Sequence, residues 1–293
     1  MLNPLPDIYM IVGPTAAGKS ALAMEMAHRL NTEIISADAF QVYRGMTIGT
    51  AKLLPSEQEG IVHHLINILN PDQPYSVTEF LKRLTPLVDQ LQNAGKPVII
   101  CGGTGFYLNA FLRRFEFAAS PSDATIKQTL ENEASNQTPL EFWKQLNTID
   151  PAAAQTIHPN NTKRVLRALE IYRTTRQLPS SQQYSSPPRE DVQIIGLDVP
   201  RDELYKQSNR RVDMMIRSGL VDEVELLLKK GYAPDLFAFQ AIGYKEVISY
   251  LNGSTSREEM IECVKLKTRR FAKRQMTWFT RFPNVKWHNP SSL

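Results

Sequence analysis

Cysteine is scarce in this chain, with two residues among 293. Cys101 and Cys263 are too few for a disulfide framework, and their spacing is not that of metal ligands. This composition is typical of a reducing compartment, so we expect a cytoplasmic protein. No apolar run approaches the ~20 residues that cross a bilayer, and no basic segment followed by an apolar stretch opens the chain. We therefore expect neither a membrane partner nor a secretion signal.

Negative charge is missing from the end of the chain. Residues 263–293 contain eight Lys or Arg and no Asp or Glu, although the net charge of the whole chain is only +4. A basic block of this kind fits either a polyanion-binding surface or a solvated helix face. With 42% hydrophobic and 22% charged residues, the composition excludes a disordered chain and allows a well-formed core.

Strand and helix patterns alternate in the first hundred residues. Ile8–Val12, Glu33–Ser36 and Pro97–Cys101 are short apolar runs typical of buried strands. Helical spacing follows in Ser20–Leu30 and again from Ser76, where a capping-box sequence opens a helix that ends near Ala94. This alternation predicts an α/β fold in which helices cover both faces of a parallel sheet.

The middle of the chain changes character. From about Ala118 to Thr175 the patterns are helical, with helix starts at Thr138 and at Asp150. Strand pattern returns at Val192–Val199. A helical block between pieces of one sheet predicts an inserted domain, so we expect core segments 1–117 and 191–293 around an insertion, 118–190.

A long helix is predicted near the end, over about Arg257–Phe282. One stripe of it is basic, and another is apolar and includes Trp278 and Phe282. We expect these two aromatic side chains to pack in the core.

A phosphate-binding motif follows the first strand. The residues match G-x-x-x-x-G-K-[ST] between a predicted strand and a predicted helix. Backbone amides of such a loop surround phosphate oxygens, the lysine adds a positive charge, and the serine hydroxyl is placed to ligate Mg²⁺. The motif predicts a phosphate cradle with Mg²⁺ as cofactor; it consists of Gly13, Pro14, Thr15, Ala16, Ala17, Gly18, Lys19 and Ser20.

The acidic residue that accompanies this loop is in an unusual place. Ordinary P-loop enzymes that hydrolyse nucleotides carry a metal-binding acid at the end of another strand. Here the strand ending at Cys101 leads into Gly102-Gly103-Thr104-Gly105, and the acid is Asp38, at the end of the second strand. A carboxylate at this edge faces the reaction crevice, where it could bind metal or act as a base.

An ordered set of motifs resembles the bacterial tRNA dimethylallyltransferase family, also called tRNA isopentenyltransferases. The resemblance extends from about residue 8 to residue 282. It implies a P-loop α/β core with a helical insertion, and transfer of a dimethylallyl group from dimethylallyl diphosphate to N6 of the adenine immediately 3′ of the anticodon. The matching segments are Gly13–Ser20, Asp38–Tyr43, Ile48–Lys52, Gly102–Tyr107, Lys163–Glu170, Ile242–Lys245 and Lys273–Trp278.

The resemblance also assigns roles. Asp38 is the expected base for the adenine amine, while Lys19, Thr104 and Arg211 are expected to stabilise the departing diphosphate. The sequence alone favours an exposed ion pair of Arg211 with Asp213 or Asp222, and only the resemblance favours diphosphate binding.

The resemblance places the anticodon stem-loop of tRNA on several segments, with a monomer as the default state. Where the family commonly has Ser, this chain has Ala17 and Ala39, which removes two hydroxyl groups. The residues expected to contact tRNA are Asp38, Ala39, Phe40, Gln41, Thr104, Lys127, Lys163, Arg164, Val165, Leu166, Arg167, Gln240, Ala241, Ile242, Gly243, Tyr244, Lys245, Lys273, Arg274, Gln275 and Thr277.

Three other functions fit parts of the sequence. A small-molecule P-loop kinase would not explain the basic end of the chain, and an adenine-nucleotide isopentenyltransferase would not need the helical insertion. A non-catalytic RNA-binding protein would not need Lys19, Ser20 and Asp38 together. His63 and His64 are adjacent, so on a strand they point to opposite sides and cannot share one metal ion.

Overall fold

The computed structural model describes residues 8–115, 124–182 and 186–290. The chain forms two compact units: Met1–Leu112 with Pro188–Leu293, and Arg113–Pro187. We call them the α/β unit and the helical unit. The domain boundary expected after residue 117 lies outside the described residues.

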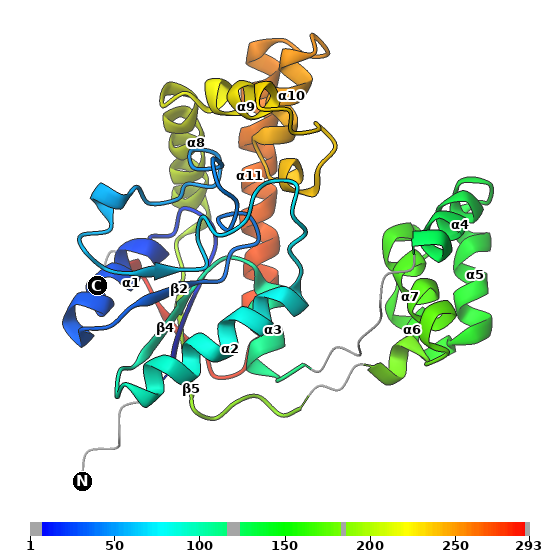
Figure 1. Ribbon diagram of the computed structural model, residues 1–293, viewed down its shortest axis with the longest axis horizontal. Helices are drawn as coiled ribbons and strands as arrows, with labels where there is room; N and C mark the ends of the chain where they lie inside the picture. Colours follow the sequence, from blue (N-terminus) through cyan, green and yellow to red (C-terminus); the bar gives the residue numbers. More distant parts are fainter. Residues whose placement is uncertain (1–7, 116–123, 183–185, 291–293) are drawn as a thin grey trace. The chain divides into compact units, whose positions relative to one another are not determined.

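A six-stranded parallel sheet forms the centre of the α/β unit, as the sequence predicts (Figure 1). The strand order is β3-β2-β4-β1-β5-β6. Since all strands run the same way, the loops after β1, β2 and β4 lie together at the carboxyl ends of the strands. The strands are β1 (Ile8–Val12), β2 (Ile34–Ser36), β3 (His63–His64), β4 (Val98–Cys101), β5 (Val192–Leu197) and β6 (Lys286–His288).

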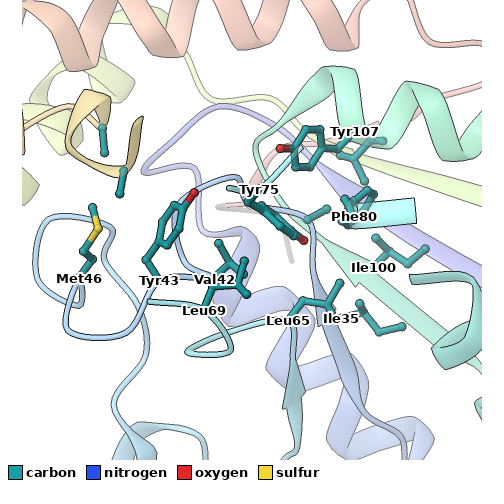
Figure 2. Packing of buried hydrophobic residues seen from close by; sticks show 14 of the residues in the cluster. Ile35, Val42, Tyr43, Met46, Leu65, Leu69, Tyr75, Phe80, Ile100 and Tyr107 are labelled. Carbon is teal, nitrogen blue, oxygen red and sulfur yellow. The ribbon is translucent and has the colours of Figure 1, made fainter. Parts of the chain in front are cut away.

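Helices cover both faces of this sheet. Tyr9 and Ile11 of β1 face the core under α1 (Lys19–Leu30). The alternate side chains face a larger core with α2 (Val77–Asn93) and α3 (Gly105–Leu112). Figure 2 shows part of that larger core, where Phe80 of α2 stacks on Tyr107 of α3. Every side chain of β1 is therefore buried, which explains the unbroken apolar run in the sequence.

Four helices complete the α/β unit. They are α8 (Arg201–Arg217), α9 (Leu220–Lys229), α10 (Tyr244–Leu251) and α11 (Arg257–Phe279), with short 3₁₀ turns at Pro55–Glu57 and Phe237–Gln240. The long helix α11 packs against α8, α3 and α10.

The expected apolar stripe of α11 is only partly buried. Phe282, just beyond the helix, is 7% exposed, as expected, whereas Trp278 is 38% exposed. Its backbone end lies against Gly105, and its ring meets Phe106 at 6.3 Å between centroids. The core-packing prediction for Trp278 is therefore wrong, because the covered face of α11 carries Gln275 and Phe279, whereas Trp278 lies beside that face and lines a cavity.

The helical unit consists of α4 (Ala124–Ser135), α5 (Pro139–Ile149), α6 (Pro151–Thr156), α7 (Thr162–Thr175) and a 3₁₀ turn, Pro179–Gln182. Three of these helices begin where side-chain caps satisfy free backbone N–H groups. Thr138 caps α5 in a complete capping box, Asp150 caps α6 and Asn161 caps α7. Phe142 and Leu146 belong to its own small core.

In the described parts of the chain, no helix combines the length and apolar character that crossing a bilayer demands.

Candidate active site

The phosphate-binding loop has the backbone conformation that its sequence predicts. Gly13, Ala16 and Gly18 have positive φ angles of 144°, 66° and 89°. Helix α1 then begins at Lys19, with no side-chain cap and no acidic residue in its first turn. Its first N–H groups and the positive end of its dipole are thus available to an anion.

Lys19 is folded back onto the loop. Its Nζ donates a hydrogen bond of 2.7 Å to the carbonyl oxygen of Pro14. The pKa of Lys19 is lowered to about 8, mainly by burial and also by nearby Arg211, while Cys101 and Asp38 oppose the shift. A buried cation without a carboxylate hydrogen-bonded to it is strongly attracted to an incoming anion.

Asp38 follows β2 and is held by the backbone after it. Its Oδ1 accepts hydrogen bonds from the amides of Phe40 (2.8 Å) and Gln41 (3.2 Å). Its Oδ2 accepts none from the described residues. Thr104, which follows β4, accepts a bond of 3.1 Å from the amide of Ala39 through Oγ1. The Thr104 hydroxyl hydrogen and Asp38 Oδ2 therefore remain available to a substrate.

One cavity of about 500 Å³ joins these groups. Arg211 enters it from α8, and burial lowers the pKa of the guanidinium. Asp213, the alternative partner of Arg211, instead pairs with Lys265 at 2.9 Å. The structure thus brings together predicted residues from six segments: Thr15, Lys19, Ser20, Asp38, Ala39, Phe40, Gln41, Thr104, Arg211, Gln240, Ala241, Ile242, Arg274 and Gln275.

The protein oxygen atoms in this cavity fit a Mg²⁺ ion whose other ligands are mainly substrate phosphates and water. Mg²⁺ prefers oxygen ligands, keeps several waters and often binds through one or two protein oxygens plus phosphates. The exposed Ser20 lines the cavity, as does Asp38. Within the described residues, no group of three or more His, Cys, Asp or Glu side chains could hold a metal by itself.

Gln41 is already engaged by the protein. Its Oε1 accepts from Ser36 Oγ at 3.0 Å, and its Nε2 donates to the carbonyl oxygen of Thr50 at 3.2 Å. An amide has two donor hydrogens and two acceptor lone pairs. One of each therefore remains for the edge of a base.

Four side chains expected to contact RNA are buried in the described structure: those of Val165, Ala241, Tyr244 and Gln275. Tyr244 is fully buried and its hydroxyl donates to Glu223 at 2.6 Å. Val165 belongs to the core of the helical unit, and Gln275 is 4% exposed. The burial of these side chains results from packing against residues far away in the sequence. The sequence does not reveal it, because each of them is next to an exposed residue.

Other predicted RNA contacts lie on the surfaces of the two units. In the α/β unit Lys245, Lys273 and Thr277 are exposed, whereas Gly243 is buried. In the helical unit the exposed residues are Lys163, Arg164, Arg167 and Lys127, and Leu166 is partly buried. Arg167 pairs with Glu170 at 2.8 Å and Lys127 with Glu131 at 3.9 Å.

Sequence reasoning assigned no role to two residues that shape the cavity. Lys52 is 5% exposed, lines the cavity and donates to Tyr43 O and Asn67 Oδ1. Burial lowers its pKa to about 8. Glu223 of α9 accepts from the amides of residues 47, 48 and 49, so it fixes the loop before Lys52. Lys52 ends one of the matching motifs, but nothing near Glu223 in the sequence indicates its partner.

The histidine pair contacts other groups of the protein, and Cys101 is an unreactive thiol. His64 contacts Glu33 at 2.6 Å, while His63 Nδ1 lies 2.9 Å from the carbonyl oxygen of Ile61. Burial raises the pKa of the Cys101 thiol to about 11, which makes it a poor nucleophile.

The parallel sheet, the phosphate loop and the carboxylate across the cavity define a P-loop enzyme of the α/β class. A family model described as IPP transferase matches residues 41–282. The chain belongs to this family of transferases, which confirms the family predicted from the motifs.

Relatives of known name cover nearly the whole chain. The tRNA dimethylallyltransferase of Acetivibrio thermocellus is 44% identical over 288 residues, which span 97% of this chain and 92% of the relative. That of Alkaliphilus oremlandii is 45% identical over 293 aligned residues, with the same coverage.

Solved structures agree with these relatives. The tRNA isopentenylpyrophosphate transferase of Bacillus halodurans is 42% identical, with a TM-score of 0.72 over 97% of this chain and 90% of that one. A eukaryotic dimethylallyltransferase acting on tRNA is 28% identical, with a TM-score of 0.83 over 97% of this chain and 74% of that one.

Proposed function

We propose that the chain transfers the dimethylallyl group of dimethylallyl diphosphate to N6 of the adenine immediately 3′ of the anticodon in tRNA, releasing diphosphate. One observation carries this proposal. The phosphate-binding groups, Lys19 and Arg211, line the same cavity as Asp38 and Thr104. A donor diphosphate and an acceptor amine can therefore meet in one enclosed space.

On the acceptor side, Asp38 supplies a base. An exocyclic adenine amine is a weak nucleophile because its lone pair is delocalised into the ring. A carboxylate within hydrogen-bonding reach takes the amine proton as the new C–N bond forms. Asp38 suits this task because the backbone amides at residues 40 and 41 hold Oδ1 and leave Oδ2 available.

On the donor side, fixed positive groups stabilise the leaving group. As the allylic C–O bond breaks, its electron pair goes to the diphosphate, whose negative charge increases. Lys19 and Arg211 line this space, the N-terminus of α1 is uncapped by any side chain, and Thr104 adds a hydroxyl donor. When bound, Mg²⁺ would neutralise part of the diphosphate charge, with Ser20 as its protein ligand.

The expected RNA-binding residues belong to both units. Arg274 lines the cavity, and Lys163 and Arg164 are exposed on α7. The target base must leave its stack to reach the enclosed carboxylate, as in other base-modifying enzymes. We further propose that the protein acts as a monomer in the cytoplasm.

A labelling experiment tests this function. The protein is incubated with Mg²⁺ and labelled dimethylallyl diphosphate, together with either tRNA or AMP. A parallel reaction contains ATP and small acceptors. We expect label only in tRNA, at adenine N6 in nucleoside mass spectrometry. Label on AMP would favour the nucleotide transferase, and phosphate transfer from ATP would favour a kinase.

A further inference from the structure

Gln275 joins three segments that are far apart in the sequence. Its side chain leaves α11 and is almost completely buried. Oε1 accepts a hydrogen bond of 2.7 Å from the amide of Thr15, in the phosphate-binding loop. Nε2 donates one of 2.9 Å to the carbonyl oxygen of Gly103, in the loop after β4. One amide group therefore bridges two loops that line the cavity.

The loop after β4 is shaped to receive this bridge. A Cβ at Gly103 would overlap Gln275 Nε2, and a Cβ at Gly105 would lie 3.0 Å from the Cβ of Trp278. At these two glycines the backbone thus approaches α11 closely, and at Gly103 no larger residue fits without a shift of Gln275. The fit holds the amide of Gln275 in place.

The same loop continues to the carboxylate. Thr104, next to Gly103, donates its amide hydrogen to the carbonyl oxygen of Ala37 at 3.3 Å. Its hydroxyl accepts from the amide of Ala39 at 3.1 Å. These two bonds flank Asp38. A continuous chain of contacts therefore runs from the phosphate-binding loop through Gln275 to the base.

We propose that Gln275 is a positioning residue that sets the phosphate-binding loop relative to Thr104 and Asp38, rather than a residue that contacts RNA. This inference rests on the proposed function. It also gives α11 two roles, because its exposed residues Lys273 and Thr277 flank a buried side chain that holds the donor loop. RNA bound on α11 and diphosphate bound in the loop are then coupled through Gln275, and the coupling is reciprocal.

The main test replaces Gln275 with methionine, which keeps the length and removes both hydrogen bonds. Phe279→Leu is the matched control, because Phe279 is fully buried in the same helix and does not line the cavity. Both variants should lower Tm. Only Gln275→Met should raise KM for dimethylallyl diphosphate and Kd for Mg²⁺–pyrophosphate, by about tenfold, with Kd for tRNA alone nearly unchanged.

A second variant adds a pH signature. In Gln275→Glu, the neutral acid can accept from Thr15 and donate to Gly103, whereas the carboxylate opposes the Gly103 carbonyl oxygen. Pyrophosphate affinity relative to the unaltered protein should therefore recover as pH falls from 8 toward 5, because burial raises the pKa of such a carboxyl group. Gly103→Ala should resemble Gln275→Met, and combining them should add little.

The outcomes separate the two claims. Unchanged donor KM and pyrophosphate Kd in Gln275→Met, or a loss confined to tRNA affinity, would overturn the inference while leaving the proposed function intact. If the unaltered protein transfers no dimethylallyl group to tRNA, the proposed function fails instead, whatever the pyrophosphate measurements show.

Discussion

The α/β unit and the helical unit assemble their functional residues in opposite ways. In the α/β unit, Lys19, Asp38, Thr104 and Arg211 come from four separate segments and meet in one cavity. In the helical unit, the exposed cations Lys163, Arg164 and Arg167 are neighbours on α7, whose start is fixed by a local cap. The first arrangement suits chemistry, and the second suits binding of a polyanion. Changes in the α/β unit should therefore alter turnover, while changes in the helical unit should alter RNA affinity.

The largest expected effect is that of Asp38→Asn. Asparagine can still accept the two backbone hydrogen bonds through Oδ1 but cannot take a proton at neutral pH. We expect kcat to fall about 10²–10⁴-fold, with tRNA affinity nearly unchanged. Single-turnover transfer and filter binding measure the two quantities. An equal loss of kcat from an exposed substitution in the helical unit would remove the contrast between the units.

Arg211→Met should lower kcat/KM for dimethylallyl diphosphate by about 10²–10³-fold, because a donor to the departing diphosphate is lost. Arg210→Met is the matched control, since Arg210 is the preceding residue of α8 and is exposed. Steady-state kinetics on both variants make the measurement. Similar losses in the two variants would contradict the role of the cavity-facing arginine.

The double substitution Lys163→Ala with Arg164→Ala tests the helical unit in the same comparison. We expect Kd for tRNA to rise about tenfold, and its salt dependence to become shallower by about two units of slope, with kcat at saturation retained. Lys144→Ala, an exposed lysine of α5, serves as control. A fall in kcat at saturating tRNA would show that the helical unit takes part in the chemistry.

Donor affinity should depend on pH through Lys19, whose pKa of about 8 lies below its usual value because of burial. Raising the pH from 7 to 8.5 neutralises most of this charge, so pyrophosphate affinity should fall about fourfold more than it does for Lys19→Arg. Calorimetry with pyrophosphate tests this.

The same pKa shift affects folding stability. Between pH 8 and about 10.5 the unfolded chain binds more protons at Lys19 than the folded chain does, so the contribution of Lys19 to the free energy of unfolding increases with rising pH.

The smallest effect is expected at a helix cap. Thr138→Ala removes the capping hydrogen bond of α5 and should lower the unfolding free energy of the helical unit by about 1 kcal/mol, with transfer kinetics unchanged. Denaturant unfolding measures the loss. A change in donor KM would mean that the two units are not functionally separate.

This contrast also explains what the sequence could predict. Elements specified locally were predicted well: the apolar run of β1, the cap at Thr138 and the phosphate loop all depend on neighbouring residues. The strand β6, by contrast, was not predicted, because its three residues are exposed at the sheet edge and show no alternation.

The sequence also failed to predict which polar residues are buried. Gln275 follows the exposed basic residues Lys273 and Arg274 and is itself polar, so the pattern around it favours a surface position. Only the partners at Thr15 and Gly103, each more than 170 residues away, reveal that it is internal. Trp278 is the reverse case, since an apolar stripe predicts burial but the residue lines the cavity beside Phe106 and is 38% exposed.

The most direct test of the central claim is a crystal structure with an unreactive dimethylallyl diphosphate analogue and an anticodon stem-loop bound together. The account predicts the diphosphate on the amides of the loop from Gly13 to Ser20, and adenine N6 about 2.6–3.2 Å from a carboxylate oxygen of Asp38. A diphosphate bound outside that loop, or an adenine beyond reach of Asp38, would contradict it.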